Sequence, residues 1–195
     1  GASIDALQAI IMNQVQFRKF PSHNSAVLNF VVDADGTSDK LAAVRWYELR
    51  QAGDGLPWSI YQEGTYNAPN QMHAWNASMG IDVQGNIAMG YTGMGGTNNQ
   101  VVSSYYTGRY VNDPIGTMTI AENVIATGNA NIPGTRYGDY SQMSIDPSDD
   151  KSFWFINEYM NSGRKDVVGV LKIAPNFSND IGVVNIINPS NGSLS

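Results

Sequence analysis

Cysteine is absent from this chain of 195 residues. Its absence excludes disulfide bridges, thiolate metal sites and cysteine nucleophiles together. Charge is also scarce, because only 14% of the residues are charged, and 11 Lys and Arg stand against 17 Asp and Glu for a formal net charge of −6. No basic stripe is available to release counterions from phosphates, so we expect no nucleic-acid partner.

Long apolar runs are missing as well. No stretch approaches the roughly 18 consecutive apolar residues that a membrane-spanning helix needs, so we expect no membrane insertion. Residues 6–12 are apolar, but no basic flank precedes them and no cleavage site follows them, so any export signal is expected upstream of Gly1. Surface polarity must come from Asn, Ser, Thr, Gln and Gly, which is typical of secreted β-proteins.

The sequence does contain a succession of short β-type runs separated by turn residues. Residues 140–145 alternate in side-chain character, residues 152–159 are rich in aromatic and β-branched side chains, and Asp146-Pro-Ser-Asp-Asp between them is turn chemistry. A shorter strand–turn–strand pattern starts at Ser78, 63 residues before Ser141. Other runs predict strands over residues 13–17, 26–32, 42–49, 58–66, 77–83, 86–92, 102–111, 122–128 and 166–174.

These runs predict an all-β protein made of about three four-stranded blades of a β-propeller. The blades lie near residues 12–66, 77–128 and 140–175, and the third group lacks a fourth strand. A single four-stranded sheet cannot bury both of its faces, whereas blades stacked around an axis cover one another. The alternative is a β-sandwich with irregular loops.

The number of blades falls short of a closed ring, since propellers have about four to eight. We therefore expect residues 1–175 to be the C-terminal part of a larger propeller, which the rest of that propeller or another chain completes. The missing last strand would come from the N-terminus of the whole ring. Residues 176–195 are expected to be a linker into a following module.

Several segments carry a family resemblance. Arg136-Tyr-Gly-Asp-Tyr-Ser, Phe153-Trp154 and Asn157-Glu-Tyr resemble the closing blades of large secreted bacterial proteins of the sialidase-like, or BNR-repeat, propeller family. Residues 44–50, 61–66, 85–91 and 106–109 add to the likeness, which covers about residues 12–175. Relatives often carry cysteine where Lys151 stands, so a disulfide seen there cannot form here.

The resemblance implies a β-propeller and a secreted or cell-surface address in bacteria, whereas the family's activity is mostly undefined. Residues 179–192 resemble the opening of an Ig-like module. Residues 188–192 also resemble the start of a sorting domain recognised by the type nine secretion machinery. Both interpretations of the tail stay open.

A sialidase-type site would need an arginine cluster that clamps the substrate carboxylate bidentately. It would also need a Tyr–carboxylate nucleophile pair and an Asp acid/base. The candidates are Arg45, Arg109 and Arg136 for the clamp, and Glu63, Tyr66, Asp139 and Tyr140 for the other roles. The favoured alternative is that the arginines pair with Glu48, Asp113 and Asp139 and hold the blades together.

Metal sites have little support. Asp33, Asp35 and Asp39 lie in an oxygen-rich loop that is a candidate Ca²⁺ site, but the twelfth loop position is not the bidentate Glu of an EF-hand, and a plain turn is favoured. His23 and His73 have no partner at ligand spacing, which argues against zinc. We therefore expect no cofactor, with Ca²⁺ as the one metal to consider.

The tryptophans divide into two groups. Trp46 and Trp154 are expected in the core between blades. Trp75 is predicted to lie in a polar loop over residues 67–75 beside His73, and these two side chains are the candidates for ligand binding.

Together these observations favour a secreted or cell-surface binding or display module for glycan or protein partners. One alternative is a glycoside hydrolase of sialidase type, which the lack of a complete hydrolase motif makes the weaker hypothesis. A second alternative is a non-catalytic cargo domain whose interaction is with the secretion apparatus.

Overall fold

The computed structural model describes residues 4–36, 40–173 and 183–187. In this part the chain forms β-strands and one short 3-10 turn, with no α-helix. No helix there is long and apolar enough to cross a membrane. The all-β prediction is confirmed, and each of the predicted strands is present with its ends shifted by a few residues.

The strands form three antiparallel sheets of four strands, each with its strands in sequence order. The first sheet contains β1 (Gln16–Lys19), β2 (Asn24–Asp33), β3 (Ala42–Gln51) and β4 (Trp58–Tyr66). The middle sheet follows the 3-10 turn Pro69–Gln71 and contains β5 (Met72–Ile81), β6 (Ile87–Gly95), β7 (Gln100–Arg109) and β8 (Ile120–Ala126). The third sheet contains β9 (Gln142–Ile145), β10 (Ser152–Met160), β11 (Arg164–Lys172) and β12 (Val183–Ile187).

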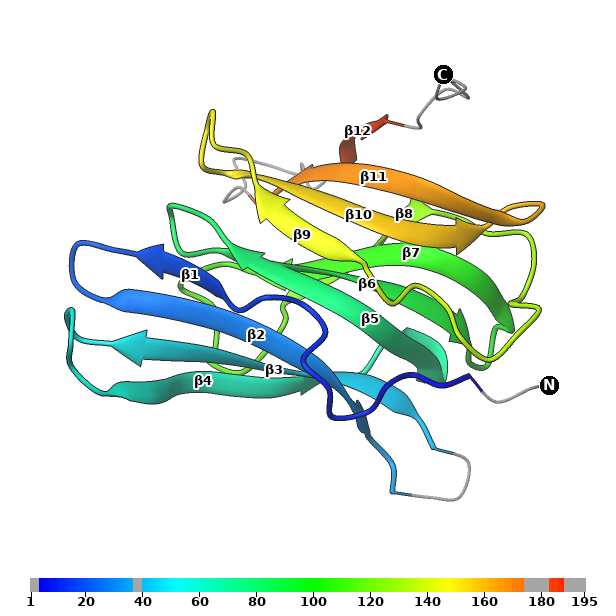
Figure 1. Ribbon diagram of the computed structural model, residues 1–195, viewed down its shortest axis with the longest axis horizontal. Helices are drawn as coiled ribbons and strands as arrows, with labels where there is room; N and C mark the ends of the chain where they lie inside the picture. Colours follow the sequence, from blue (N-terminus) through cyan, green and yellow to red (C-terminus); the bar gives the residue numbers. More distant parts are fainter. Residues whose placement is uncertain (1–3, 37–39, 174–182, 188–195) are drawn as a thin grey trace.

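The three sheets stack face to face, with the middle sheet between the other two (Figure 1). In β6 and β7 nearly every residue is buried, whereas β2, β3 and β10 alternate between buried and more exposed residues. A strand buried on both faces loses the alternation of a strand with one solvated face. The middle sheet is therefore covered on both faces, and each outer sheet is covered on one.

Two apolar layers separate the sheets. The layer between the first and middle sheets joins Val44 and Trp46 to Met89, and the layer between the middle and third sheets joins Ala88 to Phe155. Met89 and Ala88 are neighbours on β6, so successive side chains point to opposite layers. The expected core position of Trp46 agrees with its exposure of 1%.

Two segments differ from the sequence-based expectation. β5 begins at Met72, so the expected loop over residues 67–75 ends earlier and Trp75 lies in a strand. Residues Val183–Ile187 pair with β11 as the fourth strand of the third sheet, although the sequence analysis placed them in a linker and expected that strand from elsewhere. Short apolar runs in a polar tail give no local signal of which sheet edge they will join.

The stack has two ends. At the hairpin end lie the connections β1–β2, β5–β6 and β9–β10, seen at the left of Figure 1. At the opposite end, which we call the loop end, lie the turns β6–β7 and β10–β11 and the longer connection β8–β9. The site described next is at the loop end.

Candidate functional site

A β-bulge in β5 anchors the site. The pairing of β5 with β6 shifts register between Trp75 and Ser78, and Asn76 takes a φ of 48° there. Asn76 uses both its polar ends, because its side-chain amide donates to the backbone oxygen of Tyr137 and its own backbone oxygen accepts from the Ser141 hydroxyl. Bulges of this kind re-aim side chains and occur frequently beside functional sites.

Residues Arg136–Ser141, which we call the 136–141 segment, are held against this bulge at two points. Gly138 takes a φ of +71°, and a Cβ added to it would lie 2.7 Å from Asn76 Nδ2. Both the left-handed backbone and the close approach require glycine. This explains why the Tyr-Gly-Asp-Tyr motif contains a glycine at its centre.

The two tyrosines of the segment point in opposite directions. Tyr137 is 1% exposed and packs with Trp75 and Met160, whereas Tyr140 is 92% exposed. Beside them Arg136 forms an ion pair with Asp139. The segment thus presents one aromatic ring and one ion pair to solvent from a backbone that is bonded to the sheet below.

Arg164, the first residue of β11, supports the segment. Its Nη2 donates a hydrogen bond of 2.8 Å to the backbone oxygen of Arg136, and its guanidinium carbon lies 5.0 Å from the centre of the Tyr137 ring. Burial raises the pKa of Tyr137, and the nearby Glu158 carboxylate raises it further. Tyr137 is therefore a neutral hydroxyl at physiological pH.

The segment also has unused hydrogen-bonding capacity. Among the described residues, neither the Tyr137 hydroxyl nor Asp139 Oδ1 has a hydrogen-bond partner, although both atoms are buried. Most buried polar atoms in proteins do find a partner. The Tyr137 hydroxyl lies on the buried side of the segment, and Asp139 Oδ1 belongs to the residue that precedes the exposed Tyr140.

The three arginines proposed for a carboxylate clamp lie apart. Arg45 is on the first sheet and pairs with Glu63, and Arg136 is at the loop end. Arg109 closes β7 at the hairpin end, where it pairs in register with Ile87. No hydrogen bond found in the described residues joins one of these arginines to the partners of another.

Arg109 belongs to a buried polar network between the first two sheets. It is 2% exposed, donates to the side-chain oxygen of Gln62 and to the backbone oxygen of Asp113, and burial lowers its pKa. Gln62 in turn donates to Glu48, which also accepts from Arg50. Two of the expected arginine–carboxylate pairs are not formed as predicted. Glu48 pairs with Arg50 rather than with Arg45, and Asp113 accepts from Arg109 through its backbone oxygen rather than its carboxylate.

The structure contains one Tyr–carboxylate pair that the sequence did not indicate. The Tyr91 hydroxyl donates to Glu122 and lies 3.1 Å from the hydroxyl of Tyr66. Burial raises the pKa of Tyr66 to about 12, and burial raises the pKa of Tyr91 as well. Tyr91 is 0% exposed, so the pair is closed to a substrate in this structure. Sequence spacing gives no sign of it, since Tyr91 and Glu122 lie on β6 and β8 of the middle sheet and Tyr66 comes from β4 of the first sheet.

The two aromatic ligand candidates lie inside the protein or at its edge. Trp75 is 1% exposed, so its ring offers no stacking surface to a ligand. The part of the predicted loop around it belongs in fact to β5, which places Trp75 in the core. His73 is half-buried, and its Nδ1 accepts a hydrogen bond from the backbone nitrogen of Ala42 at 3.2 Å. Its role there is to join β5 to the start of β3.

The candidate Ca²⁺ loop gains no support. Asp33 ends β2 and Asp35 is exposed, while Asp39 is outside the described residues. Across the described ranges no group of three or more His, Asp or Glu side chains is arranged to hold a metal ion. At the other end of the stack, Asp149 accepts hydrogen bonds from the backbone of Lys151 and Ser152 and so closes the β9–β10 hairpin.

Compared with known proteins, the chain matches no family model and no curated sequence. Its function therefore has to be argued from the geometry described above. Asn76 and Arg164, which position the 136–141 segment, were not identified from the sequence, because their roles depend on a bulge and on a strand far away along the chain.

Proposed function

We propose that the protein is a section of a secreted or cell-surface β-propeller of bacteria and that it binds glycans through the 136–141 segment. The observation that carries the proposal is the 92% exposure of Tyr140 on a backbone tied to Asn76 at two points. A fixed, exposed tyrosine offers an apolar ring face and a hydroxyl at little entropic cost. Sugars present the matching combination of apolar C–H faces and hydroxyls.

The neighbouring polar groups suit a sugar as well. The Arg136–Asp139 pair supplies donors and acceptors beside the Tyr140 ring. Asp139 Oδ1 is buried and has no hydrogen-bond partner among the described residues, so it retains acceptor capacity for a sugar hydroxyl that reaches it. A few directional polar groups around an apolar platform are the usual composition of a small-molecule site.

The propeller part of the proposal is supported by the stacking of three similar sheets. Each consists of four antiparallel strands in sequence order, and consecutive sheets cover one another. The first and third sheets each keep one uncovered face, as expected for a section of a ring. The rest of the propeller or another chain would complete it.

The two alternatives receive less support. A sialidase-type hydrolase needs convergent arginines, and Arg109 and Arg136 lie at opposite ends of the stack. A purely passive cargo domain, carried by the type nine secretion machinery, gives no reason for a strained bulge beneath an exposed tyrosine.

The test is a glycan array that includes sialylated, neutral and bacterial glycans, probed with the wild-type chain and Tyr140→Ala. We expect retention of a subset of glycans and at least a tenfold loss in Tyr140→Ala, since an aromatic anchor contributes more than about 1.4 kcal/mol. Tyr61→Ala is the matched control, because Tyr61 is a 41%-exposed tyrosine on β4 of the first sheet.

Three results would decide against the proposal. The first is that the array retains no glycan. The second is that Tyr140→Ala binds as well as wild type. The third is that Tyr61→Ala loses as much binding as Tyr140→Ala. Cleavage of a fluorogenic sialoside by the wild-type chain would favour the hydrolase instead. Thermal unfolding of each variant shows whether a loss of binding reflects a loss of fold.

A further inference from the structure

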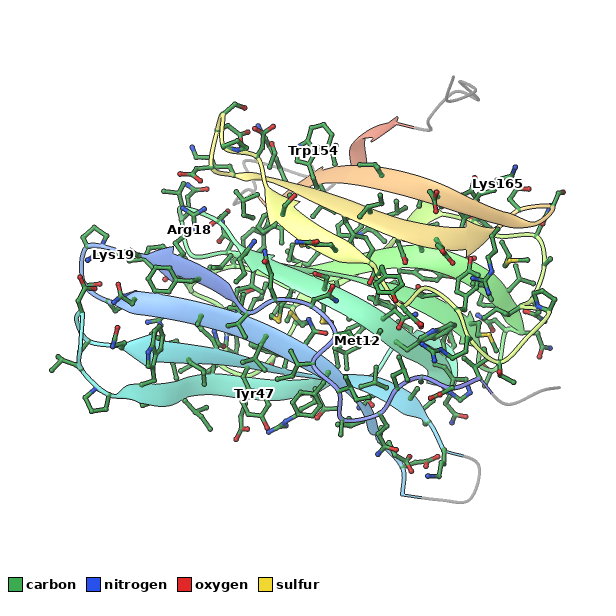
Figure 2. All side chains as sticks on the ribbon, in the orientation of Figure 1. Met12, Arg18, Lys19, Tyr47, Trp154 and Lys165 are labelled. Atoms are coloured by element: carbon green, nitrogen blue, oxygen red, sulfur yellow. The ribbon has the colours of Figure 1, made fainter. Side chains whose placement is uncertain are left out.

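Each outer sheet leaves one apolar face uncovered. On the first sheet Phe17, Trp58 and Ile60 are 56%, 43% and 58% exposed. The rings of Phe17 and Trp58 lie edge to face, with their centroids 6.3 Å apart. On the third sheet Ile156 is 47% exposed. Figure 2 shows Tyr47 below the first sheet and Trp154 above the third, at opposite sides of the stack. Exposed apolar patches on this scale mark interaction surfaces.

These faces correspond to faces that are buried inside the stack. The first hairpin of each sheet is closed by a backbone hydrogen bond, whose acceptors are His23, Asn86 and Ser152 in the three sheets. The fourth residue after that acceptor is Val27 in the first sheet, Gly90 in the middle sheet and Ile156 in the third sheet. Val27 packs against the middle sheet, and Gly90 faces the Phe155 ring of the third sheet.

Ile156 is therefore at the position that faces the next sheet, but none of the sheets formed by the described residues covers it. The third residue after the acceptor behaves in the opposite way. It is Met89 in the middle sheet and Phe155 in the third, and both pack against the preceding sheet. In the first sheet it is Ala26, which shares its row with Phe17 and Leu49 on the uncovered face.

We propose that a second copy of this chain covers both faces, in a head-to-tail dimer. One chain carries both halves of the repeating sheet-to-sheet contact. The uncovered face of its third sheet corresponds to the faces that the first and middle sheets turn toward the next sheet. The uncovered face of its first sheet corresponds to the faces that pack against the preceding sheet. A two-fold axis places the third sheet of each copy on the first sheet of the other. Both uncovered faces are then buried at once.

The number of sheets supports this occupant. Two copies of the three sheets that the described residues form make six sheets, inside the range of about four to eight in which propellers close. Three copies would make nine and exceed that range. A heterologous contact that closes gives a ring of defined size, whereas one that does not close gives a filament.

The test is the mass of the wild-type chain by native mass spectrometry and light scattering at micromolar concentration. We expect twice the 21.2 kDa of one chain. Ile60→Asp and Ile156→Asp each place a charge in one of the two faces, so each variant alone should be monomeric. Ile115→Asp, at a 61%-exposed residue in the connection after β7, should leave the dimer intact.

Mixing the two variants gives the sharper result. In a mixed dimer of Ile60→Asp and Ile156→Asp chains, both charges fall in the same interface and the other interface is wild type, so dimers should reappear. A wild-type monomer, or a filament, overturns the proposal. It is also overturned if only one of the two variants dissociates, since a symmetric contact between like faces then explains the dimer. Glycan binding is a separate readout, so the two proposals can fail independently.

Discussion

Arg18 and Asp150 form a salt bridge of 2.9 Å that joins the first sheet to the third across the hairpin end. The same guanidinium donates a hydrogen bond of 2.9 Å from its Nε to the backbone oxygen of Ile81 in the middle sheet. One side chain, labelled in Figure 2, therefore contacts all three sheets. The Arg18 side chain is 16% exposed, so solvent screens its charge only in part.

Replacing Arg18 tests this connection. We expect Arg18→Gln to lower the free energy of unfolding by about 1–2 kcal/mol, because a partly buried charged hydrogen bond and an ion pair are lost together. Lys19→Gln is the control, since Lys19 and Asp54 are both well exposed and such pairs contribute about 0–1 kcal/mol. Urea unfolding measures both. Equal effects of the two variants would show that the contact across the sheets adds nothing.

Acid should weaken the hairpin end before the rest of the stack. The Lys172 ammonium and the surrounding N–H groups hold the pKa of Asp149 below its usual 3.8, and Arg18 does the same for Asp150. A carboxyl whose pKa is lowered by folding stabilises the fold above its ordinary pKa, and that contribution is lost as the pH falls through the lowered value. The melting temperature should therefore decrease as the pH is lowered from about 4.

Asp149→Asn provides the matched comparison. Its melting temperature should lie below that of wild type at pH 7, and the gap should narrow on acidification because the wild type then loses the same charge. Melting curves from pH 7 to pH 2 measure this. A gap that stays constant with pH would mean that Asp149 acts by its shape rather than its charge.

The buried Glu48 should be costly to replace. It is 1% exposed, accepts hydrogen bonds from Ser25 and Arg50, and receives the Gln62 amide as well. Removing one member of such a group leaves the others buried and unpaired, so Glu48→Leu should lower the free energy of unfolding by about 3–5 kcal/mol. Glu63→Leu removes an exposed partner of Arg45 and should cost less than about 1 kcal/mol. Chemical denaturation separates the two values.

Gly90 sets the spacing of the middle and third sheets. A Cβ added there would lie within about 2.5 Å of Phe155 Cε1, too close for a methyl group. Gly90→Ala should lower the free energy of unfolding by about 1–3 kcal/mol through overpacking. Phe155→Leu, added to Gly90→Ala, should restore part of the loss, whereas Gly134→Ala, where a Cβ meets nothing within 4 Å, should be close to neutral. A strictly additive double-mutant cycle would contradict direct packing between Gly90 and Phe155.

Local patterns were sufficient for the strands and for some turns. The strand predicted from the alternation of residues 140–145, the strand predicted from the aromatic and β-branched residues 152–159, and the Asp-Pro-Ser-Asp-Asp turn between them are all present in the structure. Local patterns failed for Trp75, because its polar neighbours indicate a loop. In the structure Trp75 lies instead in β5, a strand buried on both faces. They failed also for β12, whose partner lies on another strand.

The candidate site could be predicted only in part. The sequence singled out the stretch that contains Tyr140 and Asp139 by its resemblance to other proteins, and the expected pairing of an arginine with Asp139 is confirmed by the Arg136–Asp139 ion pair. The sequence did not show that Tyr140 would be exposed. The bulge at Asn76 is invisible from its own neighbours. The contacts of Asn76 come from the 136–141 segment, more than sixty residues later, which binds both its side chain and its backbone.

The sequence by itself determined that this protein is built of short antiparallel strands in three groups, because side-chain alternation and turn residues act within a few positions of one another. Only the tertiary structure decided which faces are covered, which arginines are buried and which tyrosine reaches solvent. Those properties depend on how one sheet packs against the next, and packing joins residues that no local pattern connects.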